Sequence, residues 1–173
     1  MDLDTAALVA GESQIEAMMP ELIAREREPI VGITASAATI TLRITASGPD
    51  EAACRAAMQP TIDEIEATLG DLVYGVEDDE LEDAVARVLK QRKLSLAVAE
   101  WATRGQLAER LAAAGASTCG TTVQSLAAAK RLLGIALPSD VEPHASAVSV
   151  VLAEAIREKA EVDVGLGVAA FPP

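Results

Sequence analysis

Residues 94–100 read Leu-Ser-Leu-Ala-Val-Ala-Glu, and this stretch decides the fold of the second half of the chain. Its apolar run is short and continuous, which is typical of a strand buried on both faces, as in parallel sheets. Helical patterns at about 79–92 and 103–113 flank it. A strand between helices predicts a layered α/β sheet, whose ligand crevice lies where strands end. Residues 99–105 are therefore the first place to search for a site.

Further elements follow this strand. Apolar spacing predicts helices at about 124–133 and 144–160, and a strand over 162–169. The stretch 115–122, rich in Gly, Ser and Thr, is interpreted as a flexible connection. A phosphate-binding loop is the alternative, although the Gly-x-Gly-x-x-Gly spacing is missing.

The sequence patterns of the first half of the chain predict a separate α+β unit. A strand is expected at 5–10, then a helix through Ile15 and Ile23 that Pro20 kinks. Two β-branched stretches, 30–35 and 39–46, predict a hairpin, because apolar and polar residues alternate in the second. A long helix and a strand at 72–74 complete the unit. The acidic run at 77–80 marks the boundary, so the predicted domains are 1–76 and 77–173, and the fold class is α/β overall.

Composition excludes several classes of function. The formal net charge is −13, which disfavours nucleic-acid binding because that depends on Lys and Arg. Cys54 and Cys119 lie far apart and His144 is the only histidine, so no disulfide framework and no metal site are predicted. No run is long enough to span a bilayer and the start lacks a signal peptide, so we expect a cytoplasmic protein without membrane contact.

Six phrases, in this order and at these spacings, carry a family resemblance. They are Gly11-Glu12-Ser13, Leu69-Gly70-Asp71, Leu96 to Glu100, Leu107 to Leu111, Gly115-Ala116-Ser117 and Ala129 to Gly134. Together they resemble the competence/damage-inducible protein CinA, from its KH-like middle domain into a truncated C-terminal domain. The resemblance implies a metal-free nicotinamide-mononucleotide amidohydrolase with no cofactor.

The catalytic positions of that family are replaced in this chain. Trp101 stands where the resemblance places the catalytic serine. Ser125 stands at the position of the assisting tyrosine, and Ala169 at the position of a threonine. Arg104 replaces a glycine. An indole has no oxygen nucleophile, so no residue is assigned as catalytic and the site is expected to be impaired. We expect Trp101 to be largely buried and to fill the former pocket.

Four residues remain as candidates for binding a ligand: Glu100, Thr103, Gly105 and Lys130. Each has a plainer interpretation. Glu100 at a helix start is more often a cap that complements the helix dipole, and Lys130 is more often a solvated cation near a helix C-terminus.

Three functions stay open. The leading one is a catalytically impaired, CinA-like binding or assembly module with a nicotinamide nucleotide as possible ligand. The alternatives are a divergent, active amidohydrolase in pyridine nucleotide salvage and a structural partner of a full-length CinA. The resemblance implies a homodimer. Separately, the expected sheet has an edge that pairing between subunits would cover, which also predicts an oligomer. Nucleic acid is not expected, because the Gly-x-x-Gly loop of nucleic-acid-binding KH domains is missing.

Overall fold

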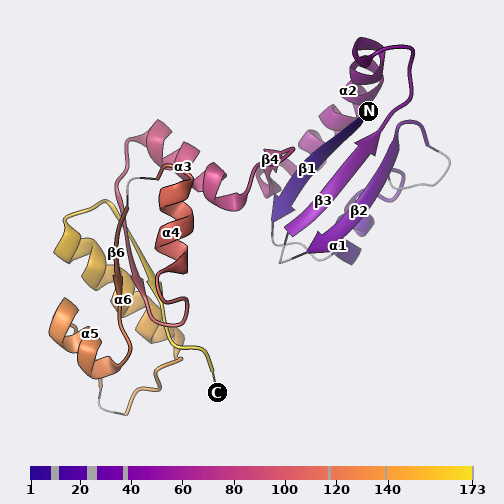
Figure 1. The fold of residues 1–173 in the computed structure, drawn as a ribbon. Coiled ribbons are helices and arrows are strands. Elements are labelled where there is room, and N and C mark those ends of the chain that lie inside the picture. The colour runs from indigo at the N-terminus through magenta and orange to yellow at the C-terminus, as the bar shows by residue number, and fades with distance from the viewer. Residues whose placement is uncertain (9–11, 23–26, 37–38, 117, 139, 173) are drawn as a thin grey trace. The chain divides into compact units, whose positions relative to one another are not determined.

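The structure, a computed structural model, describes residues 1–8, 12–22, 27–36, 39–116, 118–138 and 140–172 (Figure 1). They form two compact units, Met1–Leu81 and Glu82–Pro173. The division lies five residues beyond the predicted boundary, because the acidic run 77–80 stays with the first unit.

The first unit is an antiparallel sheet with helices. Its strands are β1 (Asp2–Leu8), β2 (Ile30–Ser36), β3 (Thr39–Thr45) and β4 (Val73–Val76), in the order β2-β3-β1-β4. Its helices are α1 (Glu12–Met18) and α2 (Glu51–Leu69), followed by a short 3-10 turn, Gly70–Leu72.

Several predictions for this unit are confirmed. The β2–β3 hairpin pairs from Ile30 opposite Thr45 to Ser36 opposite Thr39. Ile40, Leu42 and Ile44 of β3 are buried, as their alternation predicted. The kink at Pro20 is wrong: α1 ends at Met18 instead, because proline cannot continue a helix from inside. Residues 9–11 and 23, also part of these predictions, lie outside the described residues.

The second unit is a parallel sheet between helices. Its strands are β5 (Leu96–Glu100), β6 (Thr118–Thr122) and β7 (Val164–Val168), in the order β6-β5-β7. Its helices are α3 (Leu81–Arg92), α4 (Gln106–Ala113), α5 (Leu126–Leu133) and α6 (Ser146–Ala160). β5 is the central strand and buried along its whole length, as the sequence predicted.

The two faces of β5 belong to different cores. Leu96 and Val98 pack in a cluster with residues of α3 and α4. Ala97 and Ala99 pack in a cluster with residues of α5 and α6. The unit is therefore a three-layer α/β/α arrangement, and Figure 1 shows α4 and α6 on either side of the strands.

The interpretation of 115–122 as a flexible connection is wrong. Thr118–Thr122 is a strand that pairs in parallel with β5, from Leu96 opposite Thr118 to Glu100 opposite Thr122. Gly120 permits α4 to pack closely on it, since an added Cβ would lie 2.9 Å from the Ala108 Cβ. The polar composition hid the strand, although its threonines are β-branched and suit a sheet.

β7 is held at its start and along its length. The Asp163 carboxylate accepts hydrogen bonds from the Ser95 backbone nitrogen (2.8 Å) and hydroxyl (2.7 Å), which fixes the beginnings of β5 and β7 together. A Cβ added at Gly167 would lie 2.0 Å from the Ser149 carbonyl oxygen. α6 therefore rests directly on the backbone of β7, and only glycine fits there.

Candidate functional site

Three chain segments converge just beyond the carboxyl ends of the parallel strands. The Trp101 backbone nitrogen donates to the Val168 carbonyl (2.9 Å), and the Val123 nitrogen donates to the Glu100 carbonyl (2.8 Å). Residues that follow β5, β6 and β7 are thus held side by side at one edge. This is the edge at which open α/β sheets bind ligands.

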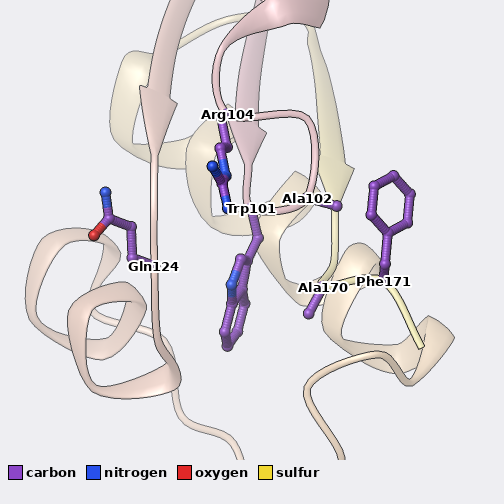
Figure 2. A pocket seen from close by; sticks show the side chains of 6 residues that line it. All are labelled: Trp101, Ala102, Arg104, Gln124, Ala170 and Phe171. Atoms are coloured by element: carbon purple, nitrogen blue, oxygen red, sulfur yellow. The ribbon is translucent and has the colours of Figure 1, made fainter. Parts of the chain in front are cut away.

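A cavity of about 450 Å³ lies at this edge. The described residues that line it are Trp101, Ala102, Arg104, Gln124, Ala170 and Phe171. Figure 2 shows the Trp101 indole and the Arg104 side chain projecting from the turn after β5, with Gln124 and Phe171 on opposite sides of them. Its size lies within the range of about 300–1,000 Å³ that is typical of small-molecule sites.

Trp101 forms a wall of this cavity. The side chain is half-buried and packs against the apolar cluster of α5 and α6. The expectation that the indole fills the pocket is wrong, because the ring lines a cavity that stays open beside it. An indole placed in this way presents both a surface for stacking and a ring N–H donor.

Arg104 stands in a backbone conformation that favours glycine. Its φ is 54°, and Gly105 follows with a φ of 99°. A side chain in this left-handed region costs about 1–2 kcal/mol relative to the right-handed one. Among the described residues that line the cavity, Arg104 carries the only charge, in a chain with a net charge of −13.

Glu100 is buried, with 1% of its surface exposed, and its carboxylate caps α4. Oε2 accepts from the Thr103 hydroxyl (2.5 Å) and from the nitrogens of Gly105 (3.1 Å) and Leu107 (3.0 Å). Oε1 accepts from the Ala108 nitrogen (2.9 Å). This geometry matches the capping interpretation.

The cap holds Glu100 in its ionised form. Burial raises the pKa of the carboxyl, but the hydrogen bonds from Thr103, Ala108, Leu107 and Gly105 together outweigh it, and the net pKa is lowered. A carboxylate so occupied and so weakly basic is poorly suited to act as a general base. Thr103 and Gly105 serve the same cap, and none of these three candidates lines the cavity.

The remaining positions singled out in the sequence are spread around the site. Ser125 is the N-cap of α5, where its Oγ accepts from the Ala128 nitrogen (3.0 Å). Lys130 is exposed in the last turn of α5. Ala169 is buried and its nitrogen donates to the Ser149 hydroxyl (3.1 Å). None of them is among the described residues that line the cavity.

Sequence reasoning missed Gln124 and Phe171 as parts of this site. Both come from segments distant from Trp101 in the chain and meet it only because β6 and β7 flank β5. Each lies close to a position that the family resemblance marks: Gln124 directly precedes Ser125, and Phe171 follows Ala169 by two residues. Arg104 was noticed as a replaced glycine, which was a usable signal.

The described part of the chain contains no group of three or more His, Cys, Asp or Glu side chains that would hold a metal ion. Nor does any helix within that part have the length and apolarity required to cross a membrane.

Comparison with known proteins finds similarity to one family in both units. Residues 8–75 match the family described as the damage-inducible protein CinA KH domain. A competence-damage inducible protein of Thermoanaerobacter pseudethanolicus is 32% identical over 163 residues, which cover 90% of this chain and 39% of that relative. A CinA-like protein of Desulfovibrio desulfuricans is 36% identical over 148 residues, 81% of this chain and 34% of the relative. The chain thus spans well under half the length of these relatives.

Proposed function

This chain belongs to the CinA family, and we propose that its parallel-sheet unit is a binding module for a small ligand that no longer hydrolyses it. The observation that carries this proposal is the lining of the cavity. Its described residues offer an indole, a guanidinium, a carboxamide, a phenyl ring and two methyl groups. They provide surface, charge and hydrogen-bond donors, but no nucleophile and no base.

The resemblance to nicotinamide-mononucleotide amidohydrolases suggests which ligand to test first. Hydrolysis of a carboxamide requires an attacking oxygen and a group that accepts its proton. Trp101 occupies the position of the family serine and supplies neither. The nucleotide itself remains a reasonable ligand, because the cavity combines aromatic surface with a cation.

A divergent active site would have to use another hydroxyl, such as that of Thr103, which follows Trp101 by two residues. The Thr103 hydroxyl already donates to Glu100. Glu100 in turn accepts three backbone hydrogen bonds, and its pKa is lowered, so it would take up the threonine proton poorly. The geometry therefore favours binding without turnover over this alternative.

Two measurements on one sample test the proposal. Nicotinamide mononucleotide is titrated into ¹⁵N-labelled protein while the single indole N–H resonance of Trp101 is followed, and ammonia release is measured in parallel. We expect a saturable shift of the indole signal with ammonia at background. Catalytic release of ammonia would overturn the loss of activity, and an unmoved indole resonance up to millimolar nucleotide would overturn binding at this cavity.

A further inference from the structure

The single charge among the described residues that line the cavity is opposite in sign to the net charge of the chain. Arg104 is exposed at the cavity, and no acidic side chain of the described residues lines the space. No ion pair joins Arg104 to an acid within the described ranges. A guanidinium without a carboxylate partner at the mouth of a cavity attracts an anion.

The polar groups also have directions. Figure 2 shows the Arg104 guanidinium above the Trp101 indole, whereas the Gln124 carboxamide is turned away from both. A guanidinium binds a carboxylate through two parallel N–H donors. This set of donors favours a carboxylate over an uncharged carboxamide, which offers only one oxygen and no charge.

The apolar groups define the rest of the ligand. Trp101 and Phe171 both line the cavity, and Phe171 is 72% exposed, which is unusual for a phenyl ring that serves only the core. Aromatic rings on either side of an open space accept a flat ring by stacking. Ala102 and Ala170 also line the cavity, and their small methyl side chains leave space between the two aromatic rings.

Arg104 adopts a left-handed backbone conformation that residues with a side chain disfavour. A glycine would adopt its φ of 54° without strain, yet this position carries the largest cation available to a protein. Strain of this kind concentrates at binding sites, where the side chain repays it through its ligand.

We propose that this cavity binds a planar aromatic carboxylate more tightly than the uncharged amide of the same shape, with Arg104 as the residue that determines the preference. The proposal rests on the proposed function, in that it assigns a ligand class to the same cavity. Its chemistry is that of an acid bound by its carboxylate, with no bond made or broken.

The test compares nicotinate with nicotinamide, two rings of nearly equal shape that differ in charge. Each is titrated into the ¹⁵N-labelled full chain while the Trp101 indole N–H resonance is followed. We expect nicotinate to bind at least about tenfold more tightly, as a charge-assisted hydrogen bond implies. Equal affinity, or a preference for nicotinamide, would overturn the proposal.

Variants assign the preference to Arg104. R104Q should bring the two affinities to within about twofold of each other, and R104K should keep part of the preference, because it retains charge without the planar fork. R131Q removes an equal charge from the exposed surface of α5 and should leave the preference unchanged. A preference that survives in R104Q would refute the role of Arg104, provided that its amide spectrum matches that of the parent chain.

Inorganic phosphate separates a general anion site from one that also needs a ring. It should compete with nicotinate only weakly, and competition at equal concentration would overturn the aromatic part of the proposal. Nicotinamide mononucleotide completes the set: if it shifts the indole resonance while nicotinate does not, the binding function stands and the ligand class proposed here falls.

Discussion

The Thr103 hydroxyl and the Glu100 carboxylate lie 2.5 Å apart, and the hydrogen bond between them closes the turn that leads from β5 into α4. The same carboxylate accepts three backbone N–H groups at the start of α4. The turn that carries Trp101 and Arg104 is therefore built around a buried negative charge. Glu100 therefore contributes to the stability of the turn that carries two of the residues lining the cavity.

Replacing Glu100 with glutamine should destabilise the second unit by about 2–3 kcal/mol. A carboxamide has one acceptor oxygen where the turn presents four donors, so buried N–H groups lose their partners. Urea unfolding followed by Trp101 fluorescence measures the change. Glu109→Gln, at an exposed position of α4, is the matched control and should change stability by less than about 0.5 kcal/mol. A loss equally small in E100Q would contradict the capping role.

The pH dependence of stability should carry the signature of the same group. The folded-state pKa of Glu100 is lowered, whereas an unfolded glutamate titrates near about 4.3. Its contribution is therefore complete above that value and is lost as pH falls through the lower, folded pKa. Urea midpoints measured from neutral to acid pH should fall less steeply for E100Q than for the parent chain. Parallel curves would show that Glu100 is not the group responsible.

Trp101→Ser should not create an amidohydrolase. The new hydroxyl would lack assistance, because Ser125 caps α5 and Ala169 has no hydroxyl. Since the indole is half-buried against the apolar cluster, its removal should cost about 1–2 kcal/mol. Ammonia assays with nicotinamide mononucleotide and urea unfolding by circular dichroism check both parts. Ammonia release in this variant would show that a base is present after all.

Arg104→Gly should leave the fold as stable or raise its stability by up to about 1 kcal/mol. Relief of the left-handed conformation favours the variant, while the greater freedom of glycine in the unfolded chain offsets part of the gain. Arg131→Gly, the same substitution inside α5, should instead cost about 1 kcal/mol. Thermal unfolding of both variants tests the contrast. A loss of more than about 1 kcal/mol in R104G would indicate a structural role for the guanidinium.

Gly167→Ala should disrupt the second unit. The added Cβ would collide with the Ser149 carbonyl, so α6 would have to lift from β7, at a cost of about 3 kcal/mol or more. Gly32→Ala in β2 is a useful control, since the nearest atom to its Cβ would be 3.9 Å away. Hydrogen exchange of the β7 amides should accelerate in G167A alone. Unchanged protection would mean that α6 packs less closely than described.

The sequence predicted those elements whose patterns are local. The β2–β3 hairpin follows from alternation, and β5 from an uninterrupted apolar run, because each pattern reflects burial on one or two faces of a sheet. Thr118–Thr122 was missed as a strand because it lies at the side of β5 and has few apolar residues to report burial. Its strand character depends on pairing with β5, which no local pattern encodes.

The candidate site was predictable in place but not in composition. The rule that open α/β sheets bind ligands at the carboxyl ends of their strands predicts a site at the end of β5, and so includes Trp101 and Arg104. Gln124 and Phe171 join them through strand order, which a single sequence does not reveal. The position of Trp101 followed from the sequence, but whether the indole fills the cavity or lines it depends on the residues that surround it in the fold.

The pairing of Ser95 with Asp163 has a consequence for the order of events when the protein is made. These residues are 68 positions apart, and β5 cannot acquire its β7 neighbour until both have left the ribosome. The strands of the first sheet all lie before residue 77, so that unit has its complete set of pairing partners much earlier. Domains that emerge first generally fold first. The nascent chain can therefore pair all strands of the antiparallel sheet before β7, one of the two neighbours of β5, has been synthesised.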